Sequence, residues 1–239
     1  MSEMPTVMIL AAGRGTRLQH LTVDTPKPMV TVGEVKPIER TMSLLHRAGY
    51  RKAVVNTCYL ADKMEAQLKA HPCGLDVHIS HEENMLETGG GIKNALPLIG
   101  SNPFVAINGD VVWGEESLPL LPLLPKLFNP DTMDGLLVLV PKEKALAHHG
   151  AGDFLMDEHG RLTHRGEEAS APFVYTGIQM LHPRLLDGAS QAAFPLLPCY
   201  LTAAKKGRLY GYVYDGPWVD MGTPDGLVAA DDLLRRWAA

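Results

Sequence analysis

The chain has 239 residues, 46% of them hydrophobic, and a formal net charge of −5 at pH 7. A chain of this length buries roughly 70–75% of its unfolded surface, which is enough for one large hydrophobic core. The mild acidity argues against a nucleic-acid-binding protein, which normally carries a basic stripe. No run approaches 18 apolar residues, so we expect no membrane-spanning helix and no membrane partner.

The beginning of the chain and its cysteines indicate the cellular compartment. The first residues contain neither a basic segment nor an apolar run, so we expect no signal peptide. The three cysteines are odd in number and widely spaced, and they form no C-x-x-C pair. Free, reduced thiols are typical of proteins in the cytoplasm, and we expect a cytoplasmic protein.

Strand and helix patterns alternate over the first 140 residues. The predicted strands are Val7–Ala11, Ala53–Asn56, Leu75–Ser80, Phe104–Asn108 and Leu136–Val140. The predicted helices are Ile38–Ala48 and Ala61–Ala70, with a further short helix after the glycines that follow Thr88. This alternation predicts right-handed βαβ crossovers, and hence an α/β fold with a mostly parallel sheet flanked by helices.

The pattern changes after Pro141. We expect a helix and a loop within residues 118–130, a hairpin from Asp153–Met156 and Arg161–His164, strands at Phe173–Leu181 and Leu209–Tyr214, and helices at Leu196–Lys206 and Asp225–Trp237. No repeat or low-complexity linker divides the chain. The sequence therefore predicts a single domain, residues 1–239, with a larger part of about 1–140 and a smaller part of about 141–239.

The first predicted strand runs into a turn rich in glycine and arginine, Leu10-Ala11-Ala12-Gly13-Arg14-Gly15-Thr16-Arg17-Leu18, and Lys27 follows between two prolines. Glycine lets backbone N–H groups approach an anion closely, and Arg and Lys supply positive charge. The pattern therefore predicts a phosphate site. The third glycine of a dinucleotide fingerprint is missing, because Leu18 stands there, which disfavours a nicotinamide dehydrogenase. The Gly-Lys-Ser/Thr triplet of a P-loop is also absent.

Two aspartates follow predicted strands. Asp110 comes directly after an apolar strand, and Asp220 lies between a strand and the last helix. Ligands of open parallel sheets bind beyond the carboxyl ends of the strands, so Asp110 is predicted to face the same crevice as the glycine turn. Mg²⁺ takes one or two carboxylates together with phosphates and water. The pair is therefore a candidate magnesium site, although each aspartate alone could form a turn or a helix cap.

The run Leu86-Glu87-Thr88-Gly89-Gly90-Gly91-Ile92 has three successive glycines at a predicted helix start. Such glycines permit close approach by a ligand, and their backbone groups can hydrogen-bond to a planar nucleobase. The alternative interpretation of this run is a flexible loop. The pair His148-His149 is predicted to lie in a polar loop, because no further residue completes a zinc site.

Taken together, these motifs resemble the signature of the sugar-1-phosphate nucleotidyltransferases, enzymes that make nucleoside-diphosphate sugars. The order and spacing of the motifs agree over nearly the whole chain. The resemblance implies a Rossmann-like mixed sheet with a nucleotide-binding part of about residues 1–140 and a small sugar-binding lobe. It also implies Mg²⁺ as cofactor, held by Asp110 and Asp220, with Arg17, Lys27 and Asp110 as catalytic residues.

The resemblance assigns the remaining site residues. Glu82 stands where several relatives carry Gln as a base contact, and Tyr175 replaces the Asn of the family's sugar contact. Asn56 is a candidate for the sugar or for simple turn formation. The predicted nucleotide-binding residues are Leu10, Ala11, Ala12, Gly13, Gly15, Thr16, Arg17, Lys27, Glu82, Thr88, Gly89 and Asn108. The predicted sugar-binding residues are Asn56, Gly152, Asp153, Tyr175, Thr176 and Gly177.

Three hypotheses on the activity remain open. Within the family the motifs are most similar to those of members that use UTP and N-acetylmuramic acid α-1-phosphate, in a peptidoglycan recycling route. The second hypothesis is the same chemistry with GTP and mannose or heptose 1-phosphate. The third is a non-catalytic sensor of nucleotide sugars. As partners we expect a nucleoside triphosphate and a sugar 1-phosphate, no nucleic acid and no membrane, in a monomer or small homo-oligomer.

Overall fold

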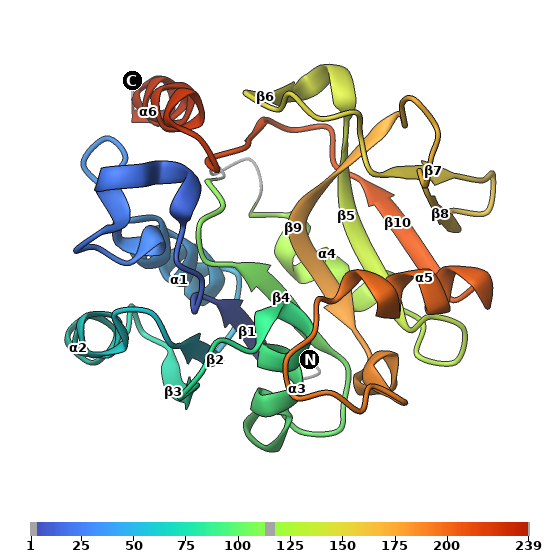
Figure 1. Ribbon diagram of the computed structural model, residues 1–239, viewed down its shortest axis with the longest axis horizontal. Coiled ribbons are helices and arrows are strands. Elements are labelled where there is room, and N and C mark those ends of the chain that lie inside the picture. The colour runs from blue at the N-terminus through green and yellow to red at the C-terminus, as the bar shows by residue number, and fades with distance from the viewer. Residues whose placement is uncertain (1–3, 113–117, 239) are drawn as a thin grey trace.

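The computed structural model describes residues 4–112 and 118–238, and in this part of the chain it has a nine-stranded sheet flanked by helices (Figure 1). The strands of this sheet are β1 Val7–Leu10, β2 Lys52–Thr57, β3 Asp76–His81, β4 Phe104–Asn108, β5 Gly135–Pro141, β7 Phe154–Met156, β8 Leu162–His164, β9 Phe173–Leu181 and β10 Leu209–Val213. A separate two-stranded sheet consists of β6 Ala145–Leu146 and β11 Trp218–Val219.

The helices alternate with these strands along the chain. They are α1 Pro37–Arg47, α2 Ala61–Ala70, α3 Glu87–Ile99, α4 Leu120–Leu127, α5 Leu197–Lys205 and α6 Pro224–Ala238. Short 3-10 helices are η1 Thr16–Thr22, η2 Lys27–Met29, η4 Lys142–Lys144 and η5 Pro183–Leu186.

The sheet has the strand order β10-β5-β9-β4-β1-β2-β3, with the hairpin β7-β8 beside β9. Strand β9 runs antiparallel to β4 and β5, whereas β4, β1, β2 and β3 pair in parallel with one another, as do β10 and β5. The prediction of a mostly parallel, mixed α/β sheet is therefore confirmed. Because β1, β2 and β4 are parallel neighbours, their carboxyl ends meet at one edge of the sheet.

Alternation along the strands divides the core into two layers. Val7 and Ile9 of β1 pack in one cluster with the apolar faces of α1, α2 and α4. Met8, between them, packs in the other cluster with α3 and α5. Successive side chains of a strand point to opposite faces, and both faces here are buried, so the strands read as continuous apolar runs.

A third apolar cluster lies apart from the sheet and connects the last helix to the loops. It contains Val32, Val112, Val219, Met221, Ala230 and Leu233. Two of these residues come from α6, and the others come from loops or from β11. The helix therefore packs on the loops that follow η2 and β4 and on β11.

The element boundaries agree with the predicted ones within a few residues, with two additions. The predicted strand at 75–80 begins and ends one residue later, and the helix expected within 118–130 is α4, which holds Pro125 in its last turn. Strands β6 and β11 were not predicted, because two residues carry no detectable periodicity. In the described part of the chain no helix is both long and apolar enough to span a membrane. All three cysteines are free thiols.

A buried carboxylate connects the loop before β5 to two arginines. Asp134 is only 7% exposed, and its Oδ1 accepts hydrogen bonds from the Nε atoms of Arg184 at 2.5 Å and Arg208 at 2.8 Å. Burial by itself raises the pKa of the Asp134 carboxyl, but the two arginines outweigh it and the pKa lies below its ordinary value. The ionised carboxylate therefore stabilises the folded state.

We predict that Asp134→Asn lowers the free energy of unfolding at pH 7 by about 2–4 kcal/mol, because two guanidinium groups lose their counter-charge. Since the folded pKa is depressed, this stabilisation is present above the unfolded pKa of about 4 and is lost as the pH falls through the folded pKa. Urea unfolding at several pH values measures it. The exposed neighbour Asp131→Asn is the control, and equal stabilities of the two variants at pH 7 would contradict the prediction.

Candidate active site

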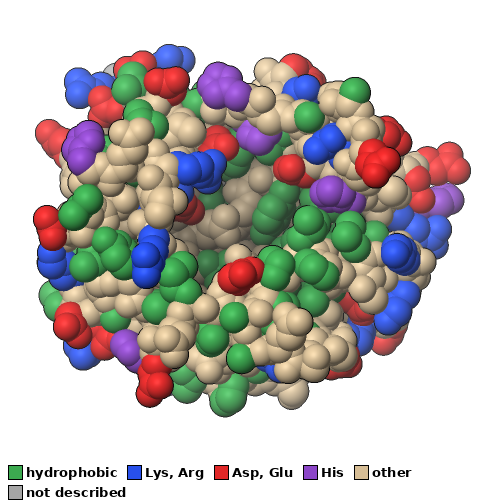
Figure 2. All heavy atoms as spheres, in the orientation of Figure 1, with side chains coloured by type: hydrophobic (Ala, Val, Ile, Leu, Met, Phe, Trp, Pro, Cys, Tyr) green, Lys and Arg blue, Asp and Glu red, His purple; other side chains and the backbone are tan. Residues whose placement is uncertain are grey.

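A cavity of about 410 Å³ opens at the carboxyl ends of β1, β2 and β4. Figure 2 shows the molecule hollowed in the middle of one face, with charged and histidine side chains on the upper rim and hydrophobic ones below. Its lining includes most of the predicted nucleotide-binding residues: Leu10, Ala11, Ala12, Gly13, Lys27, Glu82, Thr88, Asn108. Predicted residues Gly15, Thr16, Arg17 and Gly89 do not line this cavity.

The floor of this cavity is a buried polar pair. Asn56 is 3% exposed, its Oδ1 accepts from the backbone N of Ala11 at 2.8 Å, and its Nδ2 donates to Oε1 of Glu82 at 2.7 Å. The other carboxylate oxygen of Glu82 accepts from the backbone N of Leu86 at 3.2 Å. Asn56 therefore holds the glycine turn and the predicted base contact in one arrangement. It lies in this first cavity rather than in the second one, where the other candidate sugar contacts gather.

The triple glycine lies in the first turns of α3, where it lets two segments pack closely. The backbone N–H groups of Gly89 and Gly90 both donate to the carbonyl of Phe194, at 2.9 and 3.1 Å. A Cβ on Gly89 would lie 2.4 Å from the Phe194 ring, and one on Gly91 would lie 2.7 Å from Oε1 of Glu82. Gly89 is thus required for packing against Phe194, and Gly91 leaves room for the Glu82 carboxylate. The N–H of Gly89 already donates to a protein carbonyl.

A second, smaller cavity of about 150 Å³ meets the first. The two share Lys27, Asn108 and Asp110. The second cavity also holds Arg17, the other predicted metal ligand Asp220, and the candidate sugar contacts Asp153, Tyr175, Thr176 and Gly177. The fold therefore brings both predicted aspartates, two predicted cations and most predicted sugar contacts to one place.

Lys27 and Asp110 form an ion pair at the junction of the two cavities. The pair is mostly shielded, with side-chain exposures of 13% and 23%. Gly15 makes the pairing possible, because its left-handed backbone (φ +64°) brings it against Lys27, where a Cβ would lie 2.8 Å from that of Lys27. Gly15 therefore supports the lysine without lining either cavity.

Asp220 is fixed by its own turn. Its Oδ1 accepts from the backbone N of Gly222 at 2.8 Å, so the turn-forming role that its sequence position allowed is present. Its Oδ2 lies 3.4 Å from Nδ1 of His148. The guanidinium of Arg17 lies over Gly222, where a Cβ would come within 2.5 Å of it. Arg17 therefore reaches across from the glycine turn to the Asp220 segment.

The candidate sugar contacts lie at a bulge of β9. Oδ2 of Asp153 accepts from the backbone N of Tyr175 at 2.8 Å, while the hydroxyl of Thr176 donates to the carbonyl of Val138 at 2.8 Å. The strand register with β5 shifts at this point, and Gly177 has a φ of +84°. The Thr176 hydroxyl therefore stabilises the bulge rather than facing a ligand.

Two of the candidate sugar contacts, Gly152 and Tyr175, do not present a polar side-chain group to the cavity. Gly152 does not line the cavity; it packs on Ala171, whose carbonyl oxygen would lie 2.1 Å from a Cβ at that position. Tyr175 lines the cavity, and its hydroxyl is buried. Burial raises the pKa of Tyr175 well above its ordinary value, and the nearby Tyr200 adds to this shift. The Tyr175 hydroxyl therefore stays protonated.

Two further residues of the second cavity, His148 and Trp218, have no role predicted from the sequence. Trp218 donates from Nε1 to the carbonyl of Thr176 at 3.0 Å, and His148 lies beside Asp220. A histidine pair in a glycine-containing loop carries no periodic signal, so only the strand pairing of β6 with β11 could have placed His148.

The donor set fits a metal ion that shares its ligands with a substrate. In the ranges 4–112 and 118–238 no group of three or more His, Cys, Asp or Glu side chains could hold an ion alone. Asp110 and Asp220 nevertheless line the same cavity. Mg²⁺ is typically bound by one or two carboxylates and keeps water and phosphate ligands, so two aspartates beside the predicted phosphate site suit it.

Comparison with known proteins agrees with this geometry. Residues 6–149 match the Nucleotidyl transferase family, and the chain belongs to this family. It is similar to N-acetylmuramate alpha-1-phosphate uridylyltransferase of Caulobacter vibrioides, with 36% identity over 99% of this chain and 100% of the relative. It is also 28% identical to mannose-1-phosphate guanylyltransferase of Mycobacterium tuberculosis, over 95% of this chain and 64% of that protein.

The fold is likewise that of a known structure. HddC from Yersinia pseudotuberculosis, complexed with GMP-PN, superposes with a TM-score of 0.77 and 24% identity, over 97% of this chain and 100% of that one. The predicted fold class and the prediction of a sugar-1-phosphate nucleotidyltransferase are thus confirmed.

We predict that Gly91→Ala raises the dissociation constant of the nucleoside triphosphate at least about 10-fold, because the added Cβ displaces the anchored Glu82 and Asn56. Isothermal titration calorimetry with UTP and with GTP measures the effect, and thermal melting shows whether the variant is folded. An Ala variant that binds the nucleotide as tightly as the wild type would contradict the role of this buried pair.

Proposed function

We propose that the protein transfers a uridylyl group from UTP to N-acetylmuramic acid α-1-phosphate, releasing pyrophosphate and forming the UDP-sugar. The observation that carries the proposal is the junction of two cavities at Lys27 and Asp110. The first cavity has a size and a buried base-contact residue that suit a nucleoside triphosphate, and the second has room for a phosphate and part of a sugar. The muramic sugar and uracil are proposed because of the Caulobacter vibrioides relative.

The two cavities correspond largely to the two proposed parts of the chain. Every residue that lines the first cavity lies between Leu10 and Asp110, within the proposed nucleotide-binding part of about residues 1–140. The second cavity adds Arg17 and Val111 from the same part, and its other additional residues lie between His148 and Gly222, within the proposed sugar-binding part of about 141–239. We keep the cytoplasm as the proposed compartment, because all three cysteines are unpaired.

The chemistry needs alignment and charge neutralisation. The attacking oxygen belongs to a phosphate that is already anionic, so no general base is required, and the two anions repel each other until cations lie between them. Lys27, at the junction, would contact the α-phosphate and the incoming sugar phosphate. Arg17 and the backbone N–H groups of residues 13–16 would hold the departing pyrophosphate.

Asp110 and Asp220 would hold the divalent ion that this family generally uses, for which we propose Mg²⁺. When bound, such an ion screens the negative charge of the reacting phosphates. The Lys27 ammonium and Asp110 are paired in the structure, so each keeps the other at the junction. A phosphate entering the junction would draw Lys27 toward itself and leave the Asp110 carboxylate to the ion.

The first experiment is a substrate panel. Pyrophosphate release is measured with UTP, GTP, CTP, ATP and dTTP, each with N-acetylmuramic acid, N-acetylglucosamine, glucose or mannose 1-phosphate as acceptor. We expect release with UTP and the muramic acid phosphate at a kcat/KM at least about 10²-fold above the other pairs, because a base pocket that hydrogen-bonds its ligand rejects mismatched bases strongly. Efficient turnover of another pair alone would contradict these substrates.

A second candidate is guanylyl transfer to a hexose 1-phosphate. The carboxylate of Glu82 favours it, because a carboxylate can accept from both the N1–H and the amino group of guanine. Uracil offers Glu82 only its imide N–H. The Mycobacterium tuberculosis relative is a mannose-1-phosphate guanylyltransferase. Turnover of GTP with mannose 1-phosphate in the panel would support this candidate.

We predict that Asp110→Asn lowers kcat by about 10²–10³-fold or more, because both the ion and Lys27 lose a carboxylate at the reacting phosphate. Thermal melting should show that the variant remains folded. The matched control is Asp215→Asn, which removes an 80%-exposed carboxylate paired with Lys144 on the surface and should leave turnover unchanged. Full activity of Asp110→Asn in Mg²⁺ would refute the metal assignment.

A further inference from the structure

The small two-stranded sheet ends at the second cavity. Strands β6 and β11 pair in parallel, with Ala145 opposite Trp218 and Leu146 opposite Val219. The ladder continues for one more bond, from the backbone N of Asp220 to the carbonyl of Leu146 at 3.0 Å. Because parallel strands run in the same direction, the residues that follow them emerge at the same end. The sheet therefore delivers residues 148 and 220 to the same point.

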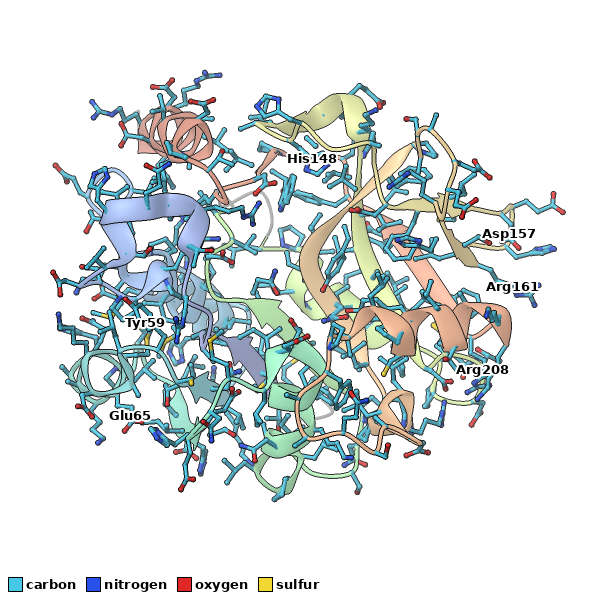
Figure 3. The ribbon with its side chains drawn as sticks, in the orientation of Figure 1. Tyr59, Glu65, His148, Asp157, Arg161 and Arg208 are labelled. Carbon is cyan, nitrogen blue, oxygen red and sulfur yellow. The ribbon has the colours of Figure 1, made fainter. Side chains whose placement is uncertain are left out.

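The turn after β6 directs His148 back toward Asp220. Ala147 has a φ of +56°, a left-handed conformation that residues with a Cβ rarely adopt. Its side chain packs against the third apolar cluster beneath α6, which holds the turn in place. In Figure 3 His148 lies below β6, on the side of the hollow away from α3, and well separated from Asp157 and Arg161 at the edge of the molecule.

The His148 ring is held in one orientation. Its side chain is 14% exposed, and it packs at a tilt against Trp218 with ring centroids 6.3 Å apart. Nε2 is buried and has no hydrogen-bond partner among the described residues, and a Cβ on Gly150 would lie 2.5 Å from it. Nδ1 lies 3.4 Å from Oδ2 of Asp220. An ionised carboxylate only accepts, so Nδ1 carries the hydrogen in this long hydrogen bond.

Both oxygens of Asp220 therefore have a donor within the protein: the backbone N–H of Gly222 donates to Oδ1, and Nδ1 of His148 donates to Oδ2. We propose that His148 is a positioning residue, which orients the Asp220 carboxylate for the divalent ion. Groups that hydrogen-bond a metal ligand typically contribute 10–100-fold to metal affinity. This inference rests on the proposed metal role of Asp110 and Asp220.

The test measures metal binding without turnover. Binding of Mn²⁺ is followed by electron paramagnetic resonance in the presence of the UTP or GTP analogue with a methylene in place of the α,β-bridging oxygen, whichever the wild type binds. His148→Leu removes the N–H, and His148→Asn, which has nearly the same shape as Leu, restores an N–H near the position of Nδ1. The exposed neighbour His149→Leu is the control.

We expect His148→Leu to raise the Mn²⁺ dissociation constant by about 10–100-fold and His148→Asn to remain within about threefold of the wild type. The affinity of both variants for the analogue without metal should be unchanged, since His148 does not line the first cavity. Equal Mn²⁺ affinities of the Leu and Asn variants would refute the positioning role. If both match the wild type, His148 does not affect the metal site. If both are weakened equally, the packing of the His148 ring, and not its N–H, accounts for the effect. If His148→Leu fails to fold, His148→Ala takes its place, and an Asn variant that binds Mn²⁺ as weakly as His148→Ala refutes the positioning role as well.

A wild-type protein that binds the analogue but no Mn²⁺ would overturn the metal assignment itself and the inference with it. A wild type that binds Mn²⁺ while His148→Leu does so equally well would overturn only the inference. The choice of sugar does not enter either measurement, so a wrong acceptor in the proposed function is distinguishable from a wrong role for His148.

Discussion

The site depends on the register in which β1 pairs with its two parallel neighbours. Leu10, the last residue of β1, lies opposite Asn56 of β2 and Asn108 of β4. This pairing places the turn after β1 beside the ends of both neighbours, so the glycine turn, Asn56 and the Asn108–Asp110 segment share one edge. A slip of one residue would turn each strand's side chains to the opposite face and separate these groups. The backbone N of Gly109, donating to the carbonyl of Leu10 at 2.9 Å, extends the register to the residue before Asp110.

Two sets of contacts connect this edge of the sheet to the rest of the site, one on the side of α3 and one on the side of α6. Toward α3, the buried Asn56 and Glu82 connect the glycine turn to the wall of the first cavity. Toward α6, the third apolar cluster holds Val112 close after Asp110 and Val219 directly before Asp220. The two proposed metal ligands thus each lie within two residues of a member of the same small cluster, although they are 110 residues apart in the chain. Packing beneath the cavity, rather than direct contact between the aspartates, brings them together.

Glycines at the site serve several different needs. Gly15 adopts a left-handed conformation against Lys27, whereas Gly91 and Gly222 leave room for Glu82 and Arg17 respectively. In none of these three cases is the space left by the missing side chain a space for the ligand. The triple glycine was predicted to let a base approach closely. In the structure these glycines instead let protein groups approach one another, and some of those groups line the cavity.

The sequence by itself determined the central α/β sheet, most of its element boundaries and the family to which the chain belongs. Strand runs such as Phe104–Asn108 are continuous and apolar because both faces of the sheet are covered. The glycines of the glycine turn, Arg17 and Lys27 fall within 15 residues of one another. These are local signals. Asp110 and Asp220 were each recognisable as candidates because each follows a strand.

Only the tertiary structure decided how these candidates are used. The pairing of β6 with β11 joins residues more than 70 positions apart and is too short to leave a periodic pattern, so His148 could not be placed beside Asp220 in advance. Asn56 and Thr176 are candidate sugar contacts in the sequence. In the structure Asn56 forms the floor of the first cavity, and the Thr176 hydroxyl donates to a backbone carbonyl at the bulge of β9. A hydrogen bond depends on two groups meeting in space, and the identity of either residue alone does not name its partner.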